Sequence, residues 1–137
     1  MIQIGGVKKA LAESTGRIYA RFTHDGVDLL LTSWVRFFTR LDNVESQGLK
    51  VWKMLSLEVI YMFDSLAPIF PQPPEVPLAL DFSIVEGARK SYKCVAWHVA
   101  QIGVVVRDDL PGDDDPKSVR EVENRNYAWI TAGPELS

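Results

Sequence analysis

The amino-acid sequence predicts an α+β fold, a twisted antiparallel sheet with helices gathered on one side. Between residues 17 and 63, long apolar runs rich in β-branched and aromatic residues are separated by short polar stretches. This is the pattern of antiparallel neighbours. Five prolines then occur between residues 68 and 77, which exclude a helix and a central strand there. Helix-start signals follow only after this segment, and 137 residues correspond to one domain, 1–137.

The N-terminal part predicts a short helix followed by a strand. Residues 7–15, VKKALAEST, contain good helix formers, and Gly16 is a typical helix stop. Residues 17–23 alternate in polarity and are rich in residues that favour strands. They lead to Asp25-Gly26, a dipeptide that favours a tight hairpin turn.

The hairpin continues into two longer strands. Residues 27–41, VDLLLTSWVRFFTRL, predict a strand that is covered on at least one face. A polar connection at 43–48 then leads to residues 52–63, WKMLSLEVIYMF, which predict the third strand. These two strands are expected to pair with each other.

Two helices are expected after the proline-rich segment. Ser83 and Glu86 have the spacing of a capping box, which predicts a helix that ends before Gly103. In such a helix Trp97 would share a face with charged residues, and a lone aromatic side chain there suggests contact with a partner. Asp115-Pro116 predicts the start of a last helix, which would run to about residue 130.

Composition excludes several classes of function. The formal net charge is −3, so the chain does not have the basic footprint of a nucleic-acid-binding protein. No apolar run reaches the roughly 18 residues of a membrane span. There is no export signal and only one cysteine, Cys94, so we expect a cytoplasmic protein.

Motifs for metals and nucleotides are also absent, so no cofactor and no metal are expected. The acidic loop between residues 108 and 115 does not have the ligand spacing of an EF-hand. His24 precedes a turn, which indicates a solvated residue, and Cys94 is interpreted as a small core residue. His98 is either a half-buried structural histidine or a member of a pocket.

Glu58 is the most unusual residue of the strands because it lies within an apolar run. By alternation it shares a row with Met54, Ile60 and Asp64. Arg36, in a row with Trp34 and Phe38 on the preceding strand, is its expected partner across the hairpin. One interpretation is an ion pair on an exposed face. The other is an apolar cavity in which desolvation and Arg36 together set the pKa of Glu58, so that it can act as a general acid or base.

The strand DGVDLLLTSWVRFF, the hairpin into WKMLSLEVIYMFDSLAP and the later LPGDD segment together resemble a known family. It is the SnoaL-like branch of the nuclear-transport-factor-2-like superfamily, in particular small proteins of secondary metabolism. The resemblance covers most of residues 5–132. It implies a cone-shaped fold whose curved sheet surrounds an apolar pocket, and frequently a homodimer. It also implies that Glu58, Tyr61 and Asp64 lie on a strand that often supplies pocket residues. The family's usual N-terminal helices are missing, so either the pocket is open, a partner subunit closes it, or this chain is a shortened form.

Two functions are therefore expected. The first is a cofactor-independent lyase, isomerase, cyclase or dehydratase that acts on a small apolar polyketide- or terpenoid-like metabolite. Its candidate catalytic residues are Glu58, Arg36 and Asp64, and its candidate substrate-binding residues are Trp34, Phe38, Tyr61, Met54 and His98. The second is a non-catalytic ligand-binding or dimerisation module of the same fold. The position of the row that contains Glu58, in a cavity or at a subunit interface, distinguishes the two.

Overall fold

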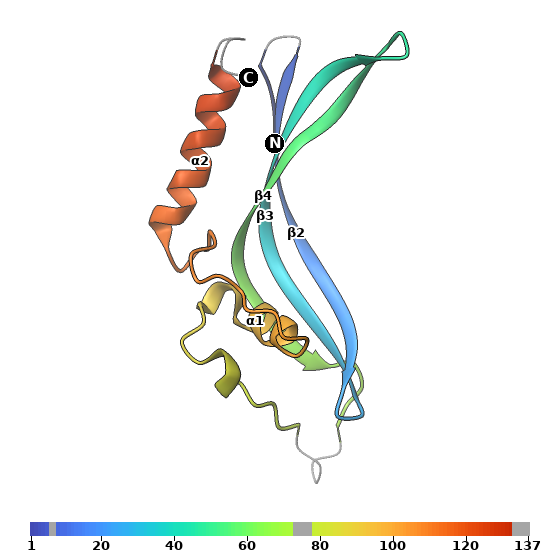
Figure 1. The fold of residues 1–137 in the computed structure, drawn as a ribbon, viewed down its shortest axis with the longest axis vertical. Coiled ribbons are helices and arrows are strands. Elements are labelled where there is room, and N and C mark those ends of the chain that lie inside the picture. Colours follow the sequence, from blue (N-terminus) through green and yellow to red (C-terminus); the bar gives the residue numbers. More distant parts are fainter. Residues whose placement is uncertain (6–7, 73–77, 133–137) are drawn as a thin grey trace.

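The computed structural model describes residues 1–5, 8–72 and 78–132. Four antiparallel strands form one sheet in the order in which they follow each other in the chain. They are β1 (Ile2–Gly5), β2 (Lys9–His24), β3 (Val27–Ser46) and β4 (Leu49–Pro68). The helical segments that follow are η1 (Ser83–Val85), η2 (Lys90–Tyr92), α1 (Lys93–Ala100) and α2 (Pro116–Thr131). The predicted α+β class is confirmed, and the sheet is neither closed nor strongly curled (Figure 1).

Both hairpins of the long strands turn through residues with positive φ. Asp25 and Gly26 have φ angles of 48° and 76°, so the predicted Asp-Gly hairpin is confirmed. The second hairpin turns at Gln47 and Gly48, with φ angles of 53° and 78°. The expected polar connection at 43–48 is therefore mostly strand, because β3 continues to Ser46.

The predicted helix at 7–15 is wrong where the chain is described, because residues 9–15 belong to β2. Pairing with β3 overrides the helix propensity of these residues, since Leu11 lies opposite Arg40 and is fully buried. Gly16 ends no helix. A Cβ at this position would lie 2.9 Å from the ring of Phe37, so glycine gives that ring its space.

The single helix predicted between Ser83 and Gly103 is also wrong. Gly87 has a φ of 80°, and the chain forms η1, η2 and the short α1 in place of one helix. The Ser83 side chain caps nothing, and its backbone N–H donates to Asp81 Oδ1 at 2.9 Å. Trp97 is no surface contact, since it is 1% exposed and its Nε1 donates to the Asp81 carbonyl at 2.8 Å. The start of α2 at Pro116 is as predicted.

Two apolar clusters attach the helices to the sheet. Leu29 of β3 packs with Ala96 and Trp97 of α1, whereas Phe38 of β3 packs with Val122 and other residues of α2. Leu29 is at an odd position of β3 and Phe38 at an even one, and the pairing of β2 with β3 has no irregularity between them. Their side chains therefore point to opposite faces of the strand. The two helices therefore contact opposite faces of a strongly twisted strand pair, α2 beside its upper half and α1 at its lower half (Figure 1). Among the described residues, no helix is long and apolar enough to cross a lipid bilayer.

Candidate functional site

Glu58 points at α2. It lies opposite Phe38 on the face of β4 that α2 covers, and its side chain is 24% exposed. Its Oε1 accepts from Arg125 Nε and its Oε2 from Asn126 Nδ2, each at 2.6 Å. Burial raises the pKa of Glu58, but the hydrogen bonds from Arg125 and Asn126 and the positive charges of Arg125 and Arg40 outweigh burial and lower it below its ordinary value. Glu58 is therefore an ionised acceptor near neutral pH.

The predicted pairing of Arg36 with Glu58 is wrong. Arg36 lies on the same face but opposite Ile60, and its Nη2 donates to Glu123 of α2 at 3.0 Å. Glu13 of β2 lies 3.9 Å from the same guanidinium nitrogen. The hairpin brings the two rows to one face, as expected, but α2 supplies each row with its own counter-charge.

Asn126 is the central residue of this interface, and the sequence did not indicate it. It is fully buried. Its Nδ2 donates to Glu58 and to the Val122 carbonyl, and its Oδ1 accepts from Arg40 Nε at 2.8 Å. A polar residue between Val122 and Trp129 on the buried stripe of α2 was the available signal.

A second polar group lies further along α2. The Tyr127 hydroxyl donates to Glu13 Oε1 at 2.8 Å. Burial, together with the Glu13 hydrogen bond and the charges of Glu13 and Glu123, raises the pKa of Tyr127 to about 12. Glu13 Oε2 is buried and has no hydrogen-bond partner among the described residues. A hollow of about 240 Å³ opens beside Glu13, Arg36 and Phe38.

These side chains form a continuous polar layer between the sheet and α2. We define the polar layer as Glu13, Arg36, Arg40 and Glu58 from the strands and Glu123, Arg125, Asn126 and Tyr127 from α2. Its charges alternate in sign and most of its polar atoms are paired. Such an interface fixes the position of α2 on the sheet.

Of the remaining predicted site residues, Phe38 lies opposite Glu58, and the others do not gather around it. Asp64 accepts from the Val95 N–H of α1 at 2.8 Å, and Tyr61 packs 5.3 Å from the ring of Tyr92. Burial raises the pKa of Tyr61. Phe38 is fully buried against α2. These positions are structural contacts to three different segments.

Trp34, Met54 and His98 also lie apart from one another. Trp34 is stacked on Phe63 at 4.5 Å between ring centres, on the face turned away from α1. Met54 is 61% exposed. The ring of His98 lies 4.2 Å from Phe22.

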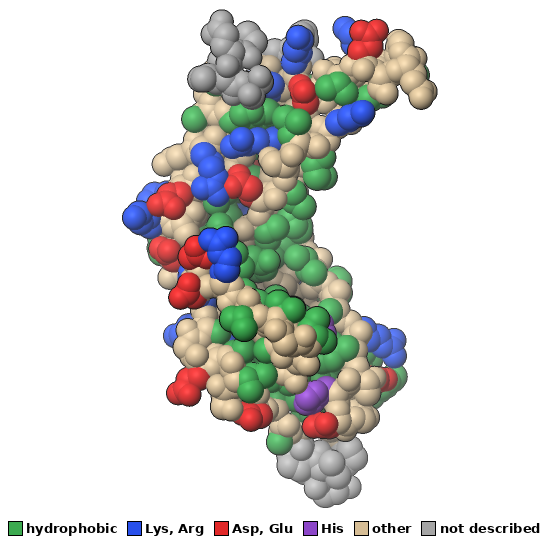
Figure 2. Space-filling view, in the orientation of Figure 1, with side chains coloured by type: hydrophobic (Ala, Val, Ile, Leu, Met, Phe, Trp, Pro, Cys, Tyr) green, Lys and Arg blue, Asp and Glu red, His purple; other side chains and the backbone are tan. Residues whose placement is uncertain are grey.

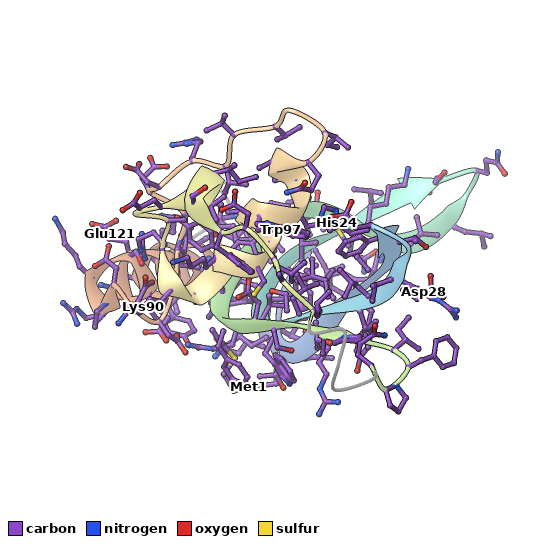
Figure 3. All side chains as sticks on the ribbon, turned by 90° about the horizontal axis from the view of Figure 1, so that it is seen from below. Met1, His24, Asp28, Lys90, Trp97 and Glu121 are labelled. Atoms are coloured by element: carbon purple, nitrogen blue, oxygen red, sulfur yellow. The ribbon has the colours of Figure 1, made fainter. Side chains whose placement is uncertain are left out.

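The aromatic residues at the base of α1 form a core rather than a pocket. In the view of Figure 3, Trp97 and His24 lie side by side between α1 and the strands, and their rings are 4.9 Å apart. His24 is half-buried there, not a solvated turn residue as predicted. Burial and the neighbouring Asp64 raise the pKa of Cys94 to about 12, so the thiol is no nucleophile at neutral pH. The described residues contain no cluster of His, Cys, Asp or Glu that could bind a metal ion.

No known protein family matches this chain, and no curated protein is similar to it.

Proposed function

We propose that the protein is a non-catalytic association module that forms a homodimer through the face of the sheet turned away from α2. The observation that carries the proposal is the composition of that face. We call it the open face, and its residues follow from the strand register: Ile2, Ile4, Ala10, Ala12, Ser14, Phe37, Thr39, Leu41, Met54, Leu57 and Val59.

The open face is apolar and is exposed along its edge strands β1 and β4, whereas Ala10 of β2 is buried. Ile2 is 70% exposed, Ile4 69%, Met54 61% and Leu57 49%. The open face extends over three residues of β1 and over five or six of each of the other strands. With about 3.4 Å per residue and about 4.8 Å between strands, the planar footprint is roughly 300 Å². Contiguous apolar patches of more than a few hundred Å² are uncommon on monomers and mark interaction sites.

The open face also carries no charged residue. Glu13, Arg36 and Glu58, charged residues of the same strands, point at α2. In Figure 2 charged side chains gather over α2 at the left, whereas apolar side chains predominate over the strands at mid-height on the right.

A second copy of the chain is the partner that this composition fits. A face without charge meets its own copy without like-charge repulsion, and it offers a charged partner no electrostatic selectivity. Two such sheets can pack face to face about 10 Å apart, with one two-fold axis relating the same patch on both subunits.

The test is the substitution Leu57→Glu, which places a charge in the middle of the open face. We expect the wild-type protein to be a dimer and Leu57→Glu to be a folded monomer by sedimentation velocity and circular dichroism. Ile102→Glu is the matched control, because Ile102 is 78% exposed on the loop after α1 and lies outside the open face. A dimer that survives in Leu57→Glu as well as in Ile102→Glu would contradict the proposal.

The proposal agrees with the resemblance to the SnoaL-like branch, in which homodimers are frequent. An antiparallel sheet with helices packed against it is a feature that the chain shares with that branch. The cone-shaped pocket of the family is the part of the resemblance that gains least support, because the sheet is not strongly curled.

A lyase or isomerase acting on a small apolar metabolite is the second candidate. The observation that favours it is the unpartnered Oε2 of Glu13 next to the 240 Å³ hollow, with Arg36 and Tyr127 beside it. In that case Glu13 replaces Glu58 as the proton-transferring carboxylate. Glu13→Gln would then abolish turnover while Glu58→Gln retains it, and equal turnover in both variants would dismiss this candidate.

A further inference from the structure

A second hollow lies between η1, α1 and the segment that follows α1. It has a volume of about 490 Å³, in the range of small-molecule sites. Ile84, Val85 and Ala88 form one wall, Ala96 and Ala100 form the floor, and residues 104–106 form the other wall. We call this hollow the α1 cleft. It shares no residue with the open face or the polar layer.

Hydrogen bonds hold the chain at Arg107 and Asp108, directly after the wall formed by residues 104–106. The Tyr92 hydroxyl donates to the Arg107 carbonyl at 3.0 Å, and Arg89 Nη1 donates to the Asp108 carbonyl at 2.9 Å. Arg89 is itself bound by Asp114 through contacts of 2.6 and 2.8 Å. The cleft is therefore preformed, so a ligand need not order the wall on binding.

The side chains inside the cleft are apolar, while backbone and rim groups supply the polar part of its surface. One wall and the floor are continuous with the core, since Val85 and Ala96 are 8% and 6% exposed and pack in one cluster with Trp97. Ala88 and Ala100 leave the space that larger side chains would fill. At the mouth Val105 is 92% exposed, so an apolar surface remains in water when the cleft is empty.

The rim of the cleft carries an excess of negative charge. Three charged residues line it, Glu86, Arg107 and Asp108. Arg107 is engaged by Asp109, with Nε 2.8 Å from Oδ1. The side chains of Glu86 and Asp108 have no ion-pair partner among the described residues. A cation is thus favoured at the rim and an anion is disfavoured.

From the volume, the apolar interior and these charges, we infer that the α1 cleft binds a small cationic amphiphile. The apolar body of the ligand contacts Ala96, Ala100 and Val105, and its ammonium group lies at the rim beside Glu86 and Asp108. The inference is independent of the homodimer, because the cleft and the open face are separate surfaces.

The test compares three probes with the same chain and different ends, namely decylamine, 1-decanol and decanoate, each below its micelle concentration. The full chain is titrated with each by calorimetry and by amide NMR. We expect decylamine to bind most tightly, decanol less tightly and decanoate least tightly. The affinity for decylamine should fall at high salt, because salt screens its attraction to the acidic side chains. Amide shifts should centre on residues 84–88 and 104–108. Equal binding of decylamine and decanoate would overturn the inference.

Matched variants locate the site. Val105→Lys, at the mouth of the cleft, should abolish decylamine binding, while Ile102→Lys, with the same change in net charge outside the cleft, should retain it. Glu86→Gln should lower the affinity for decylamine by up to about five-fold, as expected for an exposed ion pair, and leave the affinity for decanol unchanged. Equal affinities of Val105→Lys and Ile102→Lys would overturn the inference. So would loss of binding in Leu57→Glu alone, which would place the probe on the open face.

Discussion

Replacing Glu58 by glutamine tests the role of the polar layer in stability. Arg125 and Asn126 donate to different oxygens of the carboxylate. The glutamine side chain has an oxygen at only one of these two positions, so it can accept from Asn126 or from Arg125 but not from both. Asn126 is fully buried, whereas the Arg125 side chain is 49% exposed, so the oxygen should stay with Asn126 and Arg125 should turn to solvent.

The cost follows from these two changes. Loss of the partly exposed pair with Arg125 costs about 0 to 1 kcal/mol. Replacing a charged acceptor of the Asn126 bond by a neutral one costs about another 1 kcal/mol. We therefore expect Glu58→Gln to lower the free energy of unfolding by about 1 to 2 kcal/mol in urea titrations at fixed protein concentration.

The matched control is Glu121→Gln on the outer side of α2, where the ion pair with Lys117 is 3.8 Å long and exposed. It should change stability by less than about 0.5 kcal/mol. The folded state lowers the pKa of Glu58 below its ordinary 4.5, so its stabilisation is present above that pH and is lost as pH falls through the folded value. The difference in free energy of unfolding between wild type and Glu58→Gln should therefore have its full size near pH 7 and become smaller near pH 3. A loss below 0.5 kcal/mol, or a difference that grows in acid, would refute the reasoning.

Three further outcomes are expected. Gly112→Ala should cost about 1 to 3 kcal/mol in the same titration, because a Cβ would lie 2.2 Å from Ser91 Oγ; unchanged stability would contradict that contact. Asp114→Asn should cost about 1 to 3 kcal/mol near pH 7, since it breaks the contacts with Arg89 and Ser91. Because Arg89 lowers the pKa of Asp114, that difference should decrease in acid, and a pH-independent cost would argue against the pair. Cys94, with a pKa raised to about 12, should react with a disulfide reagent far more slowly than free cysteine at the same pH, and comparable rates would show an accessible thiolate.

Local patterns predicted the hairpin, the two long strands and the start of α2 because each depends on residues close in sequence. Asp25-Gly26 needs only two residues that tolerate positive φ. The helix predicted at 7–15 failed because the β3 partner of Leu11 lies some thirty positions later, and propensity carries no information on that pairing. The helix predicted from Ser83 failed at Gly87, whose positive φ ends any helical path.

In the candidate site, too, local patterns predicted some features, whereas others depend on contacts between residues far apart in the sequence. Alternation placed Glu58 and Arg36 correctly on one face. It was wrong for Met54 and Asp64, because irregularities in the pairing at Trp34/Val35 and Arg40/Leu41 put these two residues on the other face. It could not identify Arg125, Asn126 and Glu123 as their partners, because the docking of α2 depends on tertiary packing. Trp34 and Phe38 lie on the same face of β3, but Trp34 stacks on Phe63 whereas Phe38 is buried against α2, so the two do not line one pocket.

The most direct test of the proposed function is the molar mass of the wild-type protein in solution. Sedimentation equilibrium at micromolar concentration should give twice the 15.4 kDa of the chain, and Leu57→Glu should give 15.4 kDa under the same conditions. A wild-type mass of 15.4 kDa at every concentration would contradict association through the open face.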